Sequence, residues 1–454
     1  MAVTVIGSSL AALVATLRIS EFDDVLWVQT SPRIGGHFSG IEIDGVIRDI
    51  GMVLLEPFEN FDEIEPDFHK FKKASRQGAR GLIPYAFDWL GSLGFSIKNA
   101  QVFTKVDGQT FADFYIKDSL EIIHNLPNDV KSDIAREIKS LSNYSFKDLH
   151  PSNKLTSPDF LIKSFEEITL MTIGPTYMRE VIKPWANSFA KRSAVSVVAA
   201  EHRAMWLPMY YPESILRAVS GESSDFDGNE KTFAVPIGIS VGAAINDLVS
   251  LVKTKKNVCV ELAETHNFGE DVNQKVFLGN IDEFKLIFHE DRTMESELKT
   301  NSDTKANIAV AIFEGIDVMS DFDDCTVNVQ SHPSSLYRIS IRQIFKPTNH
   351  LQFTLEFGDA EGLSEIEIKT MSATEIGKFY SGSSKFKKII RTKFPITSAK
   401  TLADHSKRIA AYESELCDNG IIGFLISQQN SAFNDQLCQG LLSAEQTRKR
   451  RSNA

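Results

Sequence analysis

Small residues occupy a turn near the amino terminus where a phosphate group could be held. Val3–Ile6 is an apolar run rich in β-branched residues, and an alanine-rich stretch with apolar side chains at helical spacing follows it. This order predicts a strand, a tight turn and a helix. A pyrophosphate could rest on the first free amides of that helix, where the helix dipole is positive. The residues concerned are Gly7, Ser8, Ser9, Leu10, Ala11 and Ala12.

The spacing follows the dinucleotide pattern G-x-G-x-x-G with one departure. Gly7 and Ala12 fit, because the last position only has to let helix and strand approach closely. Ser9 replaces the second glycine, and its Cβ narrows the gap to the phosphates, although its hydroxyl could donate to a phosphate oxygen. The motif alone is weak, and an ordinary buried strand-turn-helix unit explains it as well.

A second strand is expected at Val25–Val28, because a parallel neighbour is typically short and apolar. It leads into Gln29 and Thr30. An acid normally stands where Gln29 does and accepts hydrogen bonds from the adenosine ribose. Gln29 can still accept through its carbonyl oxygen, without charge assistance.

Glycines recur after this strand and stand beside charged or polar residues. The first group is Arg33, Gly35, Gly36 and His37, and the second is Asp49 and Gly51. A plain nicotinamide site has no role for such a second glycine pair, whereas a longer flavin dinucleotide would need backbone contact at its middle. The segment 7–51 resembles the FAD-binding region of the superfamily of amine oxidases, protoporphyrinogen oxidases and UDP-galactopyranose mutases. In that superfamily R-x-G-G and then D-x-G follow the second strand, and Arg33, Gly35, Gly36, Asp49 and Gly51 stand on those positions.

The resemblance implies FAD as cofactor and an α/β fold. We expect a Rossmann-like FAD-binding domain with a parallel sheet and an inserted α+β substrate domain with an antiparallel sheet. Phe233–Gly238, the helix after it and the strand Val258–Leu262 are similar to the part of the family that returns to the FAD domain, although Ile239 replaces a glycine of the turn. The backbone at Cys259 and Val260 would then hold the adenine, and Val276–Gly279 would add another strand.

At the carboxyl end, the resemblance implies a last helix whose positive amino end faces the flavin. Asn434 or Asp435 can cap that helix. Relatives usually carry an arginine after the glycine that corresponds to Gly420 or Gly423, but this chain has apolar residues there. This departure weighs against the mutase reaction.

Candidate substrate contacts lie in two places. Aromatic residues, prolines and basic groups alternate closely in the region 171–219, which suits a rigid pocket wall, and His202, Arg203 and Tyr210 belong to it. A proline-bounded core segment explains this stretch equally well, and a lone histidine is more often structural. Tyr337 and Arg338 lie in a run that alternates with the period of a strand and resembles the strand lining the substrate site in the mutase-like branch, which implies that Arg338 faces a phosphate or carboxylate. The alternative is a solvent-facing arginine on a half-exposed strand.

Composition sets the outer limits. The chain has 454 residues, of which 42% are hydrophobic and 24% charged, as is typical of a soluble globular protein with two cores. A net charge of −11 leaves no nucleic-acid footprint over the body. The four cysteines are scattered, which argues against a metal knuckle or a disulfide framework and fits a cytoplasmic location. The sequence contains no uninterrupted run of about 18 apolar residues, so we expect no membrane span.

Three functions remain open at this level: an FAD-dependent oxidoreductase acting on a small-molecule substrate, a non-redox mutase-like isomerase, and a flavin-binding protein without turnover. No acid, base or nucleophile stands out, so the catalytic residues are unknown, as is the oligomeric state. We predict three FAD-binding segments at 1–70, 226–290 and 411–445, a helical substrate insert at 71–225, an antiparallel-sheet substrate domain at 291–410 and a solvated basic tail at 446–454.

Overall fold

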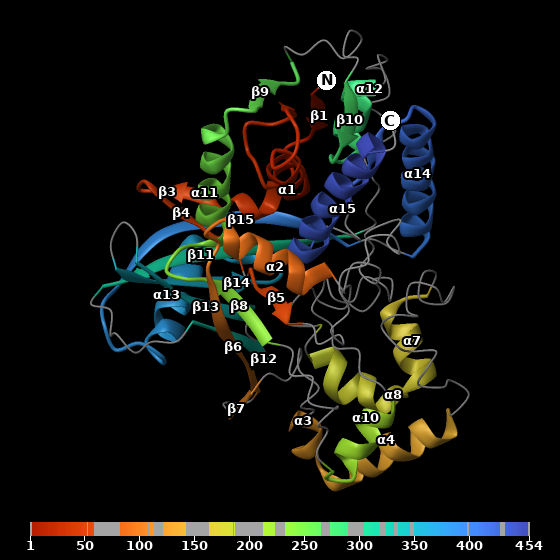
Figure 1. Cartoon of the computed structure of the whole chain (residues 1–454). Coiled ribbons are helices and arrows are strands. Elements are labelled where there is room, and N and C mark those ends of the chain that lie inside the picture. The colour runs from red at the N-terminus through yellow and green to blue at the C-terminus, as the bar shows by residue number, and fades with distance from the viewer. Residues whose placement is uncertain are drawn as a thin grey trace. The chain divides into compact units, whose positions relative to one another are not determined.

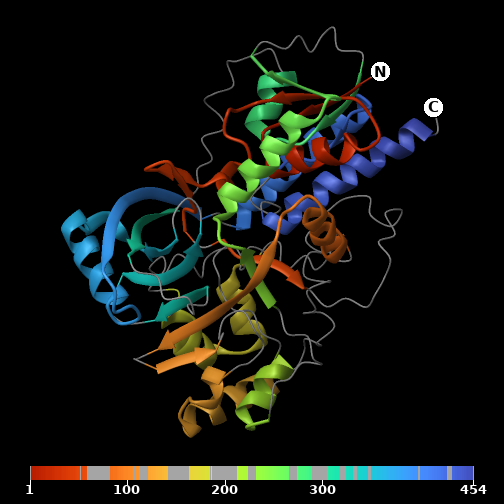
Figure 2. The ribbon, with the colours of Figure 1, turned by 60° about the vertical axis from the view of Figure 1, so that its left-hand side comes forward.

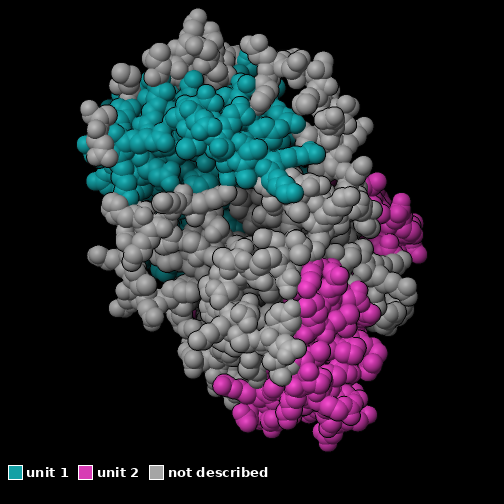
Figure 3. Space-filling model, turned by 90° about the vertical axis from the view of Figure 1, so that its right-hand side faces the viewer, with its two compact units in different colours: residues 1–98, 234–300, 405–454 teal, residues 99–233, 301–404 magenta. Residues whose placement is uncertain are grey.

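The computed structural model forms two compact units, coloured separately in Figure 3. Unit 1 comprises Met1–Lys98, Ala234–Thr300 and His405–Ala454, and unit 2 comprises Asn99–Phe233 and Asn301–Asp404. The finer domain boundaries given above remain predictions. The structure describes residues 2–51, 53–58, 82–106, 109–112, 121–141, 163–184, 186, 212–222, 232–264, 273–288, 304–316, 324–330, 335–345, 349–396, 399–426 and 432–452.

Unit 1 contains a parallel sheet with the strand order β16-β10-β1-β2-β9. The chain runs from the central strand β1 outward on one side and then continues on the other, so the strand order reverses between β1 and β10. In open α/β sheets ligands bind beyond the carboxyl ends of the strands at this switch point. The strands are β1 (Val3–Ile6), β2 (Val25–Gln29), β9 (Val258–Leu262), β10 (Gln274–Phe277) and β16 (Ile422–Gly423). The predicted Rossmann-like parallel sheet is confirmed.

Helices and short elements complete unit 1 (Figure 1). The helices are α1 (Leu10–Ile19), α2 (Ile83–Ser92), α11 (Val241–Thr254), α12 (Ile281–Phe288), α14 (Ala399–Asp418, in this unit from His405) and α15 (Phe433–Ser452). A 3-10 turn, η1 (Gly36–Ser39), and a small hairpin, β3 (Ile41–Ile43) with β4 (Val46–Arg48), follow β2. Strand β5 (Leu55–Phe58) pairs with β8 (Thr232–Pro236).

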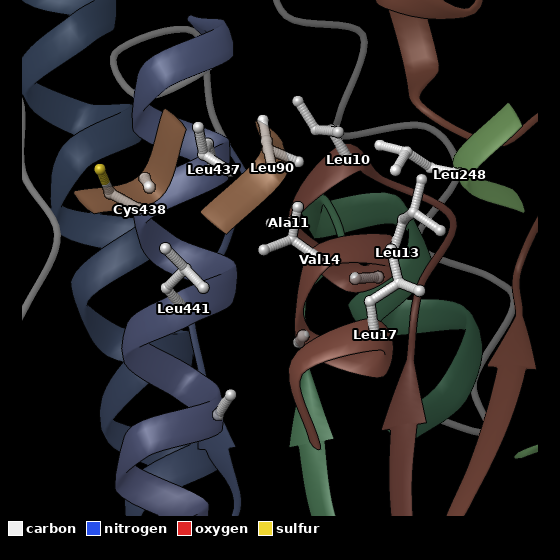
Figure 4. Packing of buried hydrophobic residues seen from close by; sticks show 14 of the residues in the cluster. Leu10, Ala11, Leu13, Val14, Leu17, Leu90, Leu248, Leu437, Cys438 and Leu441 are labelled. Carbon is white, nitrogen blue, oxygen red and sulfur yellow. The ribbon is translucent and has the colours of Figure 1, made fainter. Parts of the chain in front are cut away.

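Helix α1 is the centre of the unit 1 core. All of its residues except Arg18 are buried, and α15 lies alongside it with Leu437 and Leu441 in the same hydrophobic cluster (Figure 4). A Cβ on Gly440 would lie 2.6 Å from the Ala11 carbonyl oxygen and 2.7 Å from Val14 Cβ. Only glycine therefore allows the two helices to approach this closely, and their contact fixes the amino ends of both helices.

The basic carboxyl-terminal residues do not form the solvated tail that was predicted. Helix α15 continues to Ser452, and Arg448–Arg451 lie in its last turns. Arg451 pairs with Asp23 at 3.1 Å, and Arg450 donates a hydrogen bond to the Gly420 carbonyl. These contacts with unit 1 hold the end of the helix in place.

Unit 2 contains a mixed, largely antiparallel sheet with the strand order β15-β11-β14-β13-β12-β6, and β7 pairs with β6. Helix α13 (Glu365–Ile376) covers one face, where Ile368 and Ile376 join Phe353 and Leu355 in a second core (Figure 2). The predicted antiparallel sheet is confirmed. Its strands are β6 (Ile97–Val106), β7 (Gln109–Ala112), β11 (Thr304–Gly315), β12 (Cys325–Gln330), β13 (Leu336–Ile344), β14 (His350–Phe357) and β15 (Ser384–Ile396). A 3-10 turn, η7 (Ala360–Gly362), precedes α13.

The other described elements of unit 2 are mostly short helices. They include α4 (Asn128–Ser140), which buries Ile134 and Ile138, and α7 (Phe165–Thr172), which begins with a Ser164–Glu167 capping box. The others are α3 (Glu121–His124), α8 (Pro175–Tyr177), η3 (Met178–Ile182) and α10 (Pro212–Val219). Among the described residues, no helix has both the length and the hydrophobicity that a bilayer crossing requires.

Candidate functional site

The turn between β1 and α1 lies at the switch point of the unit 1 sheet, and its geometry requires glycine. Gly7 has a φ of 131°, and a Cβ there would lie 2.4 Å from the carbonyl oxygen of Leu278, just beyond β10. Trp27 Nε1 on β2 donates to the Gly7 carbonyl at 2.9 Å. The turn is therefore held by both strands that flank β1.

Two side chains already bond the first amides of α1. Ser9 is the N-cap: its Oγ accepts from the Ala12 amide at 3.1 Å and donates to the Leu278 carbonyl at 2.7 Å. The Leu10 amide donates to Oε1 of Gln436, in the first turn of α15, at 3.1 Å. The expectation of free amides is therefore wrong for Leu10 and Ala12. Within the described part of the chain, the Ala11 amide makes no hydrogen bond and could still donate to a phosphate.

The second glycine turn packs against the first. The Gly35 amide donates to the Ser8 carbonyl at 2.8 Å. Ser8 Oγ accepts from the Ser31 amide at 2.8 Å and donates to the Ser31 carbonyl at the same distance. Gly35 and Gly36 both have left-handed φ angles, and a Cβ on Gly36 would meet open space. The two turns predicted to form one site therefore lie together.

Arg33 is the positive charge of this region. Its guanidinium is exposed and is oriented by hydrogen bonds to Ser39 Oγ and, at 2.7 Å, to the Gly40 carbonyl. Loss of solvation at the imidazole, and then the charge of Arg33, lower the pKa of His37 to about 4. A phosphate bound here would be neutralised by Arg33.

Asp49 anchors a helix. Its Oδ2 and Oδ1 accept hydrogen bonds from the Val241 and Gly242 amides, each at 3.0 Å, and so satisfy the first turn of α11. Ile245, one turn further along α11, lies next to Gly35. Asp49 thus positions the helix that supports the second glycine turn. Gly51 follows with a φ of 79°, and direct contact of either residue with a cofactor stays a prediction.

An acid from another element, which sequence reasoning missed, lies beside the end of β2. Gln29 is half-buried there, and its backbone carbonyl oxygen accepts from the Ala263 amide at 2.8 Å. The Thr30 hydroxyl donates to the carboxylate of Glu283, in the first turn of α12, and lies 3.3 Å from Ser8 Oγ. The N-x-x-E spacing of Asn280 and Glu283, directly after the expected strand at 276–279, was the signal that could have identified this helix start.

The outer strand and the last helix carry the remaining predicted cofactor residues. Cys259 and Val260 lie on the edge strand β9, paired in register with Leu26 and Trp27 of β2, and both are exposed. Asn434 and Asp435 do not cap α15, because the helix begins at Phe433 and they lie inside its first turn. Asn434 Nδ2 donates to the Glu56 carbonyl at 2.8 Å.

In unit 2, Tyr337 and Arg338 are buried, so the solvent-facing alternative for Arg338 is wrong. The Tyr337 hydroxyl donates to Glu356 at 2.8 Å, and Arg338 Nη1 lies 3.4 Å from the same carboxylate. Burial, and then the charge of Glu356, raise the pKa of Tyr337 well above its usual value. Arg338 therefore faces a carboxylate of its own chain.

Arg338 is one of a row of buried polar residues on neighbouring strands. Three residues of β13 stand directly opposite three of β14 in the register, and all six are buried: Arg338 opposite Glu356, Ser340 opposite Thr354, and Arg342 opposite Gln352. We call these six residues the polar row. Buried polar groups are costly unless they are hydrogen-bonded, and the contact of Arg338 with Glu356 meets part of that requirement. His202, Arg203 and Tyr210 lie outside the described residues.

Comparisons with known proteins agree on the fold. No protein-family model matches the chain, and no curated protein sequence does. Among solved structures, reduced UDP-galactopyranose mutase superposes with a TM-score of 0.60 at 13% identity, covering 100% of this chain and 94% of the other. A protein provisionally named protoporphyrinogen oxidase from Exiguobacterium sp. 255-15 gives 0.52 at 14% identity, with 98% of both chains covered.

A triple mutant of putrescine oxidase gives a TM-score of 0.52 at 12% identity, with 99% of both chains covered. These likenesses extend over nearly the whole chain, and they include all three kinds of protein that the amino-terminal segment resembles. The resemblance is confirmed at the level of the fold: this chain has the architecture of the amine oxidase, protoporphyrinogen oxidase and UDP-galactopyranose mutase proteins.

Proposed function

We propose that this chain is an FAD-dependent oxidoreductase that binds the dinucleotide at the switch point of the unit 1 sheet. The observation that carries the proposal is the joining of the two glycine turns by the Gly35–Ser8 hydrogen bond, directly at the amino end of α1. The chain-wide likeness in fold to two oxidases and a mutase supports the same class.

The residues present fit a dinucleotide. The Ala11 amide, which makes no hydrogen bond within the described residues, and the exposed residue Arg33 supply donors and positive charge for a diphosphate, and open space at Gly36 leaves room for close backbone approach. The edge strand β9 beside Gln29 would flank the adenosine. When bound, flavin supplies two-electron chemistry, and the chain contributes binding, orientation and electrostatics.

The amino end of α15 would bear on the flavin ring. Helix dipoles stabilise negative charge at their amino ends, and reduced flavin is electron-rich. Asp435 in the first turn offsets part of that positive potential, because its carboxylate lies at the same helix end. We therefore expect α15 to stabilise reduced flavin less than a helix without this acid.

The polar row of unit 2 supports a polar, charged substrate in preference to a purely apolar one. Its two arginines and one glutamate are the side chains that could orient charged groups of such a substrate. Arg338 Nη1 lies 3.4 Å from the Glu356 carboxylate, and Arg342 Nη1 donates to the Ile341 and Cys325 carbonyls at 3.0 and 3.1 Å.

The first experiment is the visible spectrum of the purified protein, with FAD added if it is colourless. We expect absorbance near that of protein-bound flavin, and bleaching of that absorbance by the correct substrate under anaerobic conditions without an added reductant. Screening should cover amines, porphyrinogen-like compounds and sugar nucleotides. Absence of any flavin absorbance, together with no change in melting temperature on FAD addition, would contradict the proposal.

A mutase-like reaction is the second candidate, favoured by the likeness to UDP-galactopyranose mutase. It differs from the first because turnover would require prior reduction of the protein by dithionite. The apolar residues Ile421, Ile422 and Phe424 weigh against it, because they stand where the relatives usually carry an arginine. A flavin-binding protein without turnover is the third candidate, favoured by the two α1 amides that Ser9 and Gln436 already bond.

A further inference from the structure

We propose that Glu283 takes over the task of the acid that a dinucleotide site normally carries at the end of its second strand: its carboxylate accepts hydrogen bonds from the hydroxyls of the adenosine ribose. This inference rests on the proposed binding of FAD. The observation behind it is a missing acid: the residue at that strand end is Gln29, which carries no charge.

Hydrogen bonds place the Glu283 carboxylate beside this strand end. Thr30, the residue after β2, donates its hydroxyl to Oε1. The same hydroxyl lies 3.3 Å from Ser8 Oγ, within the first glycine turn. The acid therefore comes from a helix distant in sequence but meets the chain one residue beyond Gln29.

The carboxylate also lies at the end of β10. Its Oε2 accepts from the Asn280 amide at 2.6 Å, and a Cβ on Gly279 would lie at that same distance from it. Gly279 thus leaves the space that the carboxylate occupies. The group stands near the carboxyl ends of β2 and β10, on either side of the central strand β1, where the switch-point crevice opens.

Glu283 keeps acceptor capacity for a ligand. An ionised carboxylate offers about four lone-pair sites, and within the described part of the chain only Thr30 and Asn280 donate to this one. The side chain is half-buried, so it is neither closed off nor fully hydrated. Ribose hydroxyls could bond the remaining sites with charge assistance, which Gln29 cannot provide.

A purely structural role is the competing explanation. Asn280 and Glu283 form a reciprocal cap, in which Asn280 Oδ1 accepts from the Glu283 amide at 2.9 Å. Glutamine serves as well as glutamate at this position of a capping box. Glu283→Gln therefore preserves the cap and the shape of the side chain while removing the charge, which separates the two roles.

The test measures FAD affinity by quenching of flavin fluorescence in the full chain at fixed salt. Glu283→Gln should weaken binding about ten-fold, because charge-assisted hydrogen bonds are roughly twice as strong as neutral ones. Asp282→Asn is the matched control, because it removes the same charge from an exposed residue in the same helical turn and should leave the affinity unchanged. Gln29→Glu in the Glu283→Gln background should restore binding, which a structural role would not predict.

An FAD analogue with a 2′,3′-dideoxyadenosine moiety locates the contact. Both chains should bind it more weakly than FAD, but the loss of affinity should be about ten-fold larger for the wild-type chain than for Glu283→Gln. Equal FAD affinity of Glu283→Gln and wild type overturns the role of Glu283 while leaving FAD binding intact. If the wild-type chain binds no FAD, the proposed function and this inference both fall.

Discussion

Replacing Ser9 by glycine tests how the amino end of α1 is used. In the structure Ser9 Oγ bonds both the Ala12 amide and the Leu278 carbonyl, so the serine occupies an amide that the dinucleotide pattern leaves to the phosphate. Ser9→Gly restores the glycine of that pattern. We expect the variant to be less stable without ligand and to bind FAD more tightly.

The magnitudes follow from the two hydrogen bonds. Exchanging a serine N-cap for glycine costs a few tenths of a kcal/mol, and losing the bond to Leu278 costs about 1 kcal/mol, so the free energy of unfolding should fall by about 1–1.5 kcal/mol. The freed Ala12 amide can then donate to an anionic phosphate. A hydrogen bond to a charged group is worth about 1.5–3 kcal/mol, so FAD affinity should rise at least about ten-fold.

The chain contains a closely matched control. Ser240 caps α11 in the same way: its Oγ accepts from the Ala243 amide at 3.1 Å and donates to the Ile47 carbonyl at 2.7 Å. Ser240→Gly should lose similar stability without a gain in FAD affinity. Chemical denaturation gives the stabilities, and fluorescence titration gives the affinities. Equal or weaker FAD binding by Ser9→Gly would refute the argument that Ser9 competes with the phosphate.

Three further predictions concern the fold and the polar row. Gly440→Ala should destabilise unit 1 by about 1–3 kcal/mol in denaturant unfolding, because its Cβ would clash with Ala11 and Val14 of α1. The control Gly91→Ala in α2, where a Cβ meets nothing, should stabilise unit 1 by up to about 1 kcal/mol, and equal effects of the two variants would contradict the close helix contact. Asp49→Ala should cost about 1.5–3 kcal/mol in the same assay, since two buried amides of α11 lose a charged acceptor, and a loss below 0.5 kcal/mol, roughly that of a surface change, would argue against the cap. The pKa of Tyr337 is raised in the folded state, so the stability that this tyrosine contributes is complete below its unfolded pKa of about 10 and falls as the pH rises above that value. Tyr337→Phe should therefore reduce the loss of stability at alkaline pH. An unchanged profile of stability against pH would show that the tyrosine is not buried against Glu356.

The parallel sheet and its first turn were predictable from the sequence because local signals marked them. A run rich in β-branched residues ended in Gly7, and the turn needs glycine there because a Cβ would collide with the Leu278 carbonyl oxygen. The second glycine turn was recognisable for the same reason, since Gly35 and Gly36 adopt φ angles that other residues avoid. The alternating strands of unit 2 likewise follow from their period of two.

Long-range partners could not be predicted in the same way. The hydrogen bonds that Leu10 donates to Gln436 and Thr30 donates to Glu283 join residues hundreds of positions apart, and nothing in their local sequence marks the partner. The same holds for Asp49, whose fit to a family motif hid its contact with α11. The start of α15 was misplaced because Asn434 and Asp435 are good capping residues that here lie within the first turn of the helix.

The most direct test of the account is equilibrium titration of the purified full chain with FAD, followed by absorbance and melting temperature. We predict saturable binding at one site per chain, with a perturbed flavin spectrum and a higher melting temperature, and weaker binding when Arg33 is changed to Ala. A chain that neither retains nor binds FAD would contradict the assignment of the switch point as a dinucleotide site.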